Sequence, residues 1–279
     1  MPVSPVYQAV RDFTSICQRT SPANAARWTA ALIAHLPECT KNRSLVPADR
    51  TWELAGATFK TSAGSTVALP GAYTAGAREM YCRNVYLRTG LTMPNEGWVM
   101  DLGANRGLFS VWAALSGATT IAVEAQEGFA QEIRRLATHN GVDARVRIEI
   151  AVASGAKTSG TQVGEVADED VWAATSHGGV TRPADRSIPE LMSEHGIDRV
   201  RLMKMDIEGG EFAVLAANED LSWLSLVDQL AIELHHGHGD MIALVNRLRD
   251  HGLVVDLRDD SGSRVPATSS SVAYAYCRR

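Results

Sequence analysis

The sequence predicts an α/β protein with a mostly parallel, seven-stranded sheet, helices on both faces of that sheet, and an N-terminal helical extension. Short apolar strands alternate with helical segments from residue 98 onwards, and this alternation is typical of parallel sheets. A glycine-containing turn follows the first of these strands. The N-terminal residues have helical spacing of apolar side chains instead.

The helical extension is predicted to cover residues 1–55. Apolar residues recur at helical spacing from Val6 to Arg19, and Ser21-Pro22 ends this pattern and can begin the next helix. Residues 25–36 form an Ala-rich helical segment that stops before Pro37. We interpret the extension as a packing cap on the main domain, residues 56–279. A lid, or the contact surface of a homodimer, is the alternative interpretation.

The main domain begins with a predicted hairpin, residues 58–61 and 65–69, and a helical segment at 76–87. The predicted sheet then follows as seven strands: 98–102, which is short and apolar, 120–124, 146–152, 200–207, 230–234, 253–257 and 272–277. Helices are predicted at 108–116, 131–140, 211–217 and 241–251. Residues 154–185 are rich in Gly, Ser, Thr and Asp and predict an irregular segment. Such a segment is either a functional loop or a tolerated surface insertion.

Composition excludes several classes of function. The net charge is −5, which argues against a protein that neutralises nucleic-acid phosphates. Four scattered cysteines without CxxC spacing argue against a thiolate zinc site and fit reduced thiols. No signal peptide and no apolar stretch of membrane-spanning length is recognised in the sequence. We therefore expect a cytoplasmic protein with a small-molecule substrate and neither a nucleic acid nor a membrane as partner.

The turn after the first strand indicates the cofactor. It has the pattern DxGxNxG, formed by Asp101, Gly103, Asn105 and Gly107. Nicotinamide dinucleotides favour GxGxxG, and the leading carboxylate would repel a pyrophosphate. A carboxylate suits a ligand with an ammonium and a sulfonium, as in S-adenosylmethionine. Glu124 ends the next strand, where a carboxylate can accept hydrogen bonds from both ribose hydroxyls.

Six segments of the sequence resemble the FkbM family of S-adenosylmethionine-dependent methyltransferases. They span residues 76–252, apart from a gap at 154–185. The most specific is Lys204-Met-Asp206-Ile-Glu208-Gly-Gly-Glu211, close to the family's Lys-x-Asp-x-Glu-Gly-x-Glu. The other five are Gly76–Tyr86, Val99–Ser110, Val123-Glu124-Ala125, Ala151-Val152-Ala153 and Ala231–His235. Ala125 departs from the family's proline and affects only the wall of the adenosine site.

The resemblance implies a Rossmann-like class I methyltransferase fold whose last strand is antiparallel. It also implies an O-methyltransferase that acts on a sugar or a tailored natural product. A carboxylate or nitrogen acceptor, or a nicotinamide-dependent oxidoreductase, is the alternative. The implied cofactor-binding residues are Glu79, Asp101, Gly103, Asn105, Gly107, Glu124, Ala125, Ala151 and Asp206.

Four polar residues at the ends of two neighbouring strands are the candidates for catalysis: Asp206, Glu208, Glu233 and His235. The period-two geometry of an extended strand would put each pair on one side. In one interpretation, Asp206 and His235 share proton abstraction, Glu208 holds a substrate hydroxyl, and no metal is needed. In the other, Asp206, Glu233 and His235 hold a divalent cation. Glu211 is expected either in the site or as a carboxylate favoured by a helix dipole.

Overall fold

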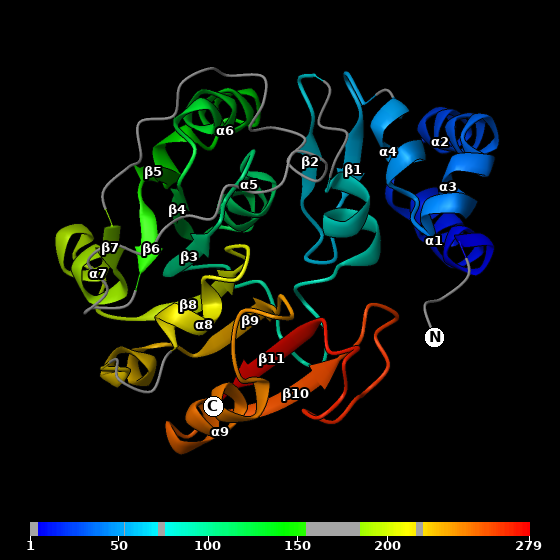
Figure 1. Cartoon of the computed structure of the whole chain (residues 1–279). Helices are drawn as coiled ribbons and strands as arrows, with labels where there is room; N and C mark the ends of the chain where they lie inside the picture. Colours follow the sequence, from blue (N-terminus) through cyan, green and yellow to red (C-terminus); the bar gives the residue numbers. More distant parts are fainter. Residues whose placement is uncertain (1–4, 53, 72–75, 155–184, 216–219) are drawn as a thin grey trace.

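The computed structural model describes residues 5–52, 54–71, 76–154, 185–215 and 220–279. Its centre is a seven-stranded sheet in the order β10-β11-β9-β8-β3-β4-β5 (Figure 1). All neighbouring strands are parallel except those paired with β11, which is antiparallel to β9 and β10. The predicted fold class is therefore confirmed. The strands are β3 (Trp98–Leu102), β4 (Thr119–Glu124), β5 (Val146–Ile150), β8 (Val200–Met205), β9 (Gln229–Glu233), β10 (Val254–Arg258) and β11 (Tyr274–Arg278).

The order of the strands reverses next to β3. From β3 the chain moves outward through β4 and β5, and then returns to β8 and β9 on the other side of β3. Ligands of open α/β sheets bind beyond the carboxyl ends of the strands at such a reversal. The turn after β3 and the residues after β8 and β9 therefore share one edge of the sheet.

The sheet separates two apolar cores, and the strands contribute to both by alternation. In β3, Val99 belongs to the core that also contains helix α5 (Leu108–Leu115), whereas Met100 and Leu102 belong to the opposite core. The opposite core is built with helices α7 (Ile188–His195) and α9 (Met241–Asp250). Burial on both sides explains why the central strands β3 and β8 consist mainly of apolar residues.

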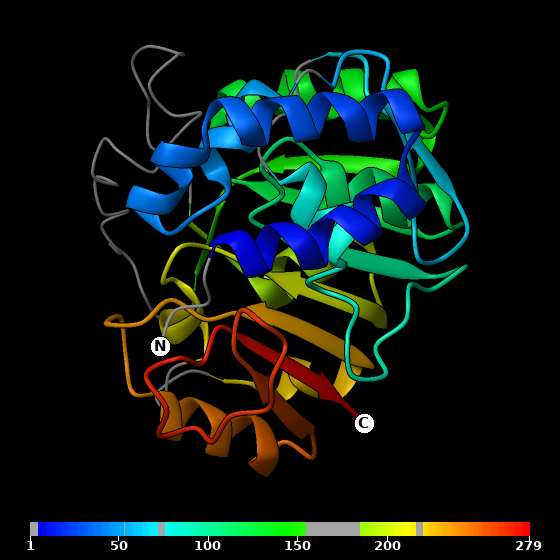
Figure 2. The same ribbon diagram turned by 90° about the vertical axis from the view of Figure 1, so that its right-hand side faces the viewer.

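The N-terminal helices pack on the same core as α5 (Figure 2). Buried Trp28 and Trp52 from this region share a core with Phe109 and Trp112, so the apolar packing is continuous across residue 55. The domain boundary between residues 55 and 56 stays a prediction. The helices are α1 (Pro5–Arg19), α2 (Pro22–Ala34), α3 (Leu36–Asn42) and α4 (Val46–Thr51), and Ser21 caps α2 as its sequence suggests.

The segment between the extension and the sheet differs in part from its prediction. The hairpin is confirmed as β1 (Thr58–Lys60) and β2 (Thr66–Ala68). The helix expected over 76–87 is a short π-helix, η1 (Arg78–Arg83), that ends where Asn84 takes a left-handed conformation with φ 51°. The remaining residues of that range form turns, and they bring Tyr86 towards the carboxyl ends of β8 and β9.

Several element ends also differ from their predictions. Strand β5 stops at Ile150, and residues 152–154 form β6 (Val152–Ser154), which pairs with β7 (Asp185–Ser187). Strand β8 stops at Met205. Helix α6 (Glu127–His139) begins four residues before the predicted start, α8 (Glu211–Val214) is short, and η2 (Asp143–Arg145) and η3 (Ser222–Leu226) are 3-10 turns. Almost all of the predicted irregular segment, residues 155–184, lies outside the described residues.

Helix α7 was not predicted, although the sequence contains its start signal. The side chain of Ser187 accepts a hydrogen bond from the Glu190 amide, and the Glu190 carboxylate accepts one from the Ser187 amide. This reciprocal cap satisfies two amides that a helix start leaves unpaired. In the described residues, no helix has the length and apolar character needed to cross a membrane.

Candidate active site

The predicted cofactor turn connects β3 to α5, and both of its glycines have a backbone conformation that other residues rarely adopt. Gly103 has φ 74°, and a Cβ at this position would lie 1.7 Å from the backbone carbonyl oxygen of Asp206. Gly107 has φ 80°, and a Cβ there would lie 3.0 Å from a side-chain carbon of Ile133. Side chains other than hydrogen are therefore disfavoured at both positions. The turn lies directly against the backbone that follows β8.

Glu124 fixes the turn from the end of β4. One carboxylate oxygen accepts a hydrogen bond from the Asn105 amide at 2.7 Å, and the other accepts one from the Gln126 amide at 2.9 Å. Burial raises the pKa of Glu124, and these two amides oppose that shift. Each oxygen has a second lone pair that can accept a ribose hydroxyl. The residues present therefore fit the nucleoside half of S-adenosylmethionine.

Asp101, at the start of the turn, is paired with other residues of the chain. Its fully buried carboxylate accepts a hydrogen bond from Ser110 at 2.6 Å and forms an ion pair with Lys204 Nζ at 3.2 Å. Lys204 also donates to the Gly103 carbonyl oxygen at 2.8 Å. Burial would lower the pKa of Lys204, but Asp101 and Asp206 outweigh burial and raise it. The charge of Asp101 is thus balanced by Lys204 within the chain, and its role in cofactor binding stays a prediction.

Asp206 lies just beyond β8, and its carboxylate contacts Tyr86 and Lys204. One carboxylate oxygen is 2.8 Å from the hydroxyl of Tyr86 and 3.5 Å from Lys204 Nζ. The same hydroxyl is 2.7 Å from a carboxylate oxygen of Glu233, and Tyr274 donates to the other oxygen of Glu233 at 3.5 Å. Burial, followed by the charge of Asp206, raises the pKa of Glu233 to about 8. Asp206 and Glu233 are therefore joined through one phenol.

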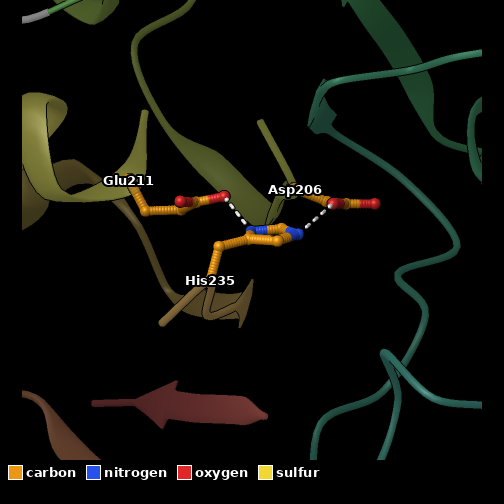
Figure 3. Close-up of side chains that lie close together, drawn as sticks. All are labelled: Asp206, Glu211 and His235. Atoms are coloured by element: carbon orange, nitrogen blue, oxygen red, sulfur yellow. Dashed lines mark hydrogen bonds and ion pairs between the residues drawn. The ribbon is translucent and has the colours of Figure 1, made fainter. Parts of the chain in front are cut away.

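The ring of His235 lies between the carboxylates of Glu211 and Asp206 (Figure 3). Its Nδ1 donates to the buried carboxylate of Glu211 at 3.1 Å, and its Nε2 is 3.3 Å from Glu208 and 4.0 Å from Asp206. Glu211 also accepts the Ile207 amide at 2.9 Å. Burial would lower the pKa of His235, but the hydrogen bond to Glu211 and the nearby carboxylates raise it to about 9.

The alternation expected for the catalytic pairs does not continue beyond the strands. Because β8 ends at Met205 and Glu208 has φ 53°, Glu208 reaches His235 through a turn and not along an extended strand. Glu233 and His235 contact different partners, Tyr86 and Glu211 respectively. The structure nevertheless places all four predicted residues, Asp206, Glu208, Glu233 and His235, at the carboxyl ends of β8 and β9.

The metal-ligand set differs from the one considered from the sequence. In the described residues, the side chains with ligand atoms within 4.8 Å of one another are Asp206, Glu211 and His235, so Glu211 takes the place of Glu233. The two ring nitrogens of His235 point to different carboxylates (Figure 3). These three side chains could hold a metal ion, with one ligand atom from each. The divalent cation stays a prediction.

Three predicted cofactor residues lie around this arrangement. Glu79, on η1, has a side chain that is 43% exposed and forms an ion pair with Arg83 at 3.0 Å. Ala125 is half-buried directly after Glu124, and Ala151 is buried and donates its amide to the Glu124 carbonyl at 3.0 Å. Their roles in cofactor binding stay predictions.

Sequence reasoning assigned no role to Tyr86, Lys204 or Tyr274. Tyr86 and Lys204 belong to segments that resemble the FkbM family, and a lysine inside a buried strand is itself a signal. A buried ammonium needs carboxylate partners, and the two nearest candidates in the predicted fold were Asp101 and Asp206. Tyr274 had no comparable signal, because its contact with Glu233 depends on the antiparallel register of β11.

Comparison with known proteins identifies the family. The model of the methyltransferase FkbM domain matches residues 101–256, more than half of the chain. The match includes the turn after β3, Glu124, and the polar ends of β8 and β9. The chain belongs to the FkbM methyltransferase family and is an S-adenosylmethionine-dependent methyltransferase.

Two relatives and one solved structure show how far the similarity extends. The chain is 28% identical over 238 residues to the 31-O-demethyl-FK506 methyltransferase FkbM of Streptomyces tacrolimicus, covering 73% of this chain and 91% of that one. It is 29% identical over 234 residues to the AMB antimetabolite synthetase AmbE of Pseudomonas aeruginosa, covering 66% of this chain but only 11% of the synthetase. A precorrin-6y C5,15-methyltransferase from Geobacter metallireducens is 13% identical, with a TM-score of 0.37 and coverage of 66% and 80%.

Proposed function

We propose that this methyltransferase transfers the methyl group to a hydroxyl of a small molecule, a sugar or a tailored natural product. The observation that carries the proposal is the His235 ring held between Glu211 and the pair Asp206 and Glu208. When bound, S-adenosylmethionine supplies an electrophilic methyl group on a sulfonium. The chain must supply the acceptor's orientation and a destination for its proton.

A hydroxyl needs such a destination because it is a weak nucleophile while it keeps its proton. Asp206 and His235 share proton abstraction in this proposal, and Glu208 holds the acceptor hydroxyl by a hydrogen bond. Glu211 fixes the ring through Nδ1, which leaves Nε2 as the nitrogen on the side of Asp206 and Glu208. A positioned base contributes about 10²–10⁴-fold to a rate.

The charge at this edge of the sheet argues against a carboxylate acceptor. Asp206, Glu208, Glu211 and Glu233 lie around a single histidine and Tyr86. The carboxylate of an acceptor brought among these groups would be repelled, and it would need no base because it has no proton to lose. The net charge of −5 also favours a small molecule over a nucleic acid.

The names of the relatives support the same class of acceptor. One is a 31-O-demethyl-FK506 methyltransferase, whose name describes methylation of an oxygen on a natural product, and it matches over most of its length. The other is an antimetabolite synthetase, of which the matched part is a small fraction. A hydroxyl on a secondary metabolite or on a sugar within one is therefore the acceptor to test first.

The experiment compares acceptors that differ only in the reacting group. The enzyme is incubated with methyl-labelled cofactor and matched panels of an alcohol, the corresponding carboxylic acid and the corresponding amine, built on sugar and macrolide frameworks. We expect label in a methyl ether that survives mild alkaline hydrolysis, and loss of most of it with Asp206→Asn. Label found only in an alkali-labile ester or on nitrogen would overturn the hydroxyl assignment.

A further inference from the structure

Tyr86 occupies a position that fixes the protonation of its neighbours. Its hydroxyl is 2.8 Å from Asp206 Oδ2 and 2.7 Å from Glu233 Oε2, and the side chain is buried. The ring is held by Phe109 and Tyr274, with centroids 5.9 and 6.2 Å away, and by Lys204 Nζ at 5.1 Å from the ring centroid. The hydroxyl therefore has little freedom to leave either carboxylate.

Counting hydrogens shows that two ionised carboxylates do not satisfy this geometry. A phenol carries one hydrogen and can donate it to one acceptor. If Asp206 and Glu233 were both ionised, the second contact would bring lone pairs together at hydrogen-bond distance. One carboxyl group must therefore carry a hydrogen and donate it to the oxygen of Tyr86. The chain of three groups then contains two hydrogen bonds and one negative charge.

The neighbours of the two carboxyl groups decide which one is neutral. Asp206 has Lys204 Nζ at 3.5 Å and His235 Nε2 at 4.0 Å, and both cations stabilise a carboxylate. Glu233 is buried and its hydrogen-bond partners are the phenols of Tyr86 and Tyr274. Burial and the charge of Asp206 raise the pKa of Glu233 to about 8, which also favours the neutral form of Glu233. The groups that face Glu233 are Tyr86, Asp206, Lys204, Tyr274, Glu79 and His235.

We infer that Glu233 is held as the neutral acid and donates a hydrogen bond to the hydroxyl oxygen of Tyr86. The Tyr86 hydroxyl in turn donates to Asp206, which carries the negative charge. Tyr86 and Glu233 are then positioning residues for Asp206, an inference that rests on the proposed role of Asp206 as a proton acceptor. In the step, the O–H bond of the acceptor breaks and a new O–H bond forms on Asp206. Tyr86 and Glu233 keep their hydrogens throughout.

Infrared spectroscopy of the folded enzyme tests the protonation directly. We expect the carbonyl-stretch band of a protonated carboxylic acid at neutral pH, with a shift in D₂O, and its loss in Glu233→Gln. Glu211→Gln is the matched control, because Glu211 is also buried but accepts only N–H groups, and it should leave the band in place. A band that persists in Glu233→Gln, or is absent from the wild type, would overturn the inference.

Kinetics test the positioning role. The amide of Glu233→Gln can still donate to Tyr86, so this variant should keep kcat within about threefold, whereas Glu233→Ala and Tyr86→Phe should lower kcat about tenfold with unchanged cofactor affinity. Equal losses in the Gln and Ala variants would contradict the role. If the band behaves as expected but no hydroxyl is methylated, the proposed function fails alone. If hydroxyl methylation is confirmed without the band, only the inference fails.

Discussion

The cofactor turn and the polar ends of β8 and β9 lie side by side but use their charges differently. In the turn, Asp101 is paired with Lys204 and Ser110, and Glu124 binds two backbone amides. At the ends of β8 and β9, carboxylates outnumber cations, and hydrogen bonds with Tyr86 and His235 stabilise these carboxylates. The turn is thus held by backbone geometry, whereas the catalytic side depends on protonation. Substitutions in the turn should therefore impair cofactor binding and stability, whereas substitutions on the catalytic side should lower kcat.

The largest effect is expected in the turn, from Gly103→Ala. The new Cβ would lie 1.7 Å from the Asp206 carbonyl oxygen at φ 74°, so either the turn or the end of β8 must move. We expect no measurable cofactor binding by calorimetry and a lower melting temperature. Gly141→Ala is the matched control. Its φ is 67°, but no atom of the described residues would lie within 4 Å of the new Cβ, so the substitution should cost only about 1–2 kcal/mol in stability. Normal binding by Gly103→Ala would show that the turn is not held as described.

On the catalytic side, Asp206→Asn should leave the fold and the cofactor affinity intact and lower kcat. The loss expected for removal of a positioned base is about 10²–10⁴-fold, measured by transfer of labelled methyl to a hydroxyl acceptor. Asp256→Asn provides a control, since Asp256 is a carboxylate on β10 that pairs with Arg258, and it should keep full activity. A kcat for Asp206→Asn within a few-fold of the wild type would move proton abstraction to another group.

These two regions also differ in how far sequence could predict them. The turn, its two glycines and Glu124 follow one another along the chain, and their residue types have a local meaning: positive φ, a short strand, a carboxylate at its end. The strands were predicted for the same reason, because burial on both sides gives apolar runs such as Ile121 to Val123. Local patterns are sufficient where the backbone determines the structure.

The catalytic side could be predicted only in part because its partners are distant in sequence. Asp206 and His235 were identifiable as polar residues at strand ends. Their contacts with Tyr86 and Glu211 depend on how the segment after η1 packs and on how the chain turns at Glu208, with φ 53°. Pairing across the fold also explains why the ion pair of Asp101 with Lys204 was not predicted. Lys204 is 103 residues later in the chain than Asp101.

Lys204 connects the two regions, and its removal should affect stability more than chemistry. Lys204→Met would leave the buried carboxylate of Asp101 without its counter-ion and remove the bond to the Gly103 carbonyl. Breaking a buried pair from one side costs about 3–5 kcal/mol, measured by urea unfolding. The double variant Asp101→Asn with Lys204→Met should recover part of that cost, because the fully buried position 101 no longer carries an unpaired charge. Strictly additive losses would mean that the pair is not coupled.

The pH dependence separates the two regions further, through His235. Only a neutral ring can accept a proton, and the pKa of His235 is raised to about 9, so the share of the rate that depends on His235 should rise with pH up to about pH 9, above the share that Asp206 carries alone. Stability should change in the opposite direction. The pKa is higher in the folded chain than the ordinary 6.5, so the stabilisation is fully present below pH 6.5 and is lost as pH rises through 9.

The measurements are kcat and urea unfolding between pH 6 and 9.5, with His235→Gln subtracted as the control. In that variant, both slopes that belong to the ring should disappear, because no imidazole titrates. The cofactor affinity should show little change in either protein over this range, since the turn is held by amides and a buried ion pair. A rate slope that persists in His235→Gln would assign the titration to another group.

The smallest effect is expected from Glu208→Gln, because Glu208 is the most exposed member of the catalytic side. Its side chain is 70% exposed and its contact with His235 is an ion pair at 3.3 Å. Exposed ion pairs contribute about 0–1 kcal/mol, so kcat should change by less than about fivefold. If Glu208 holds the acceptor hydroxyl as proposed, the change should appear mainly as a higher KM for the acceptor. A fall in kcat as large as that of Asp206→Asn would instead place Glu208 in the proton transfer itself. Glu208 would then accept the proton and would not merely hold the acceptor hydroxyl.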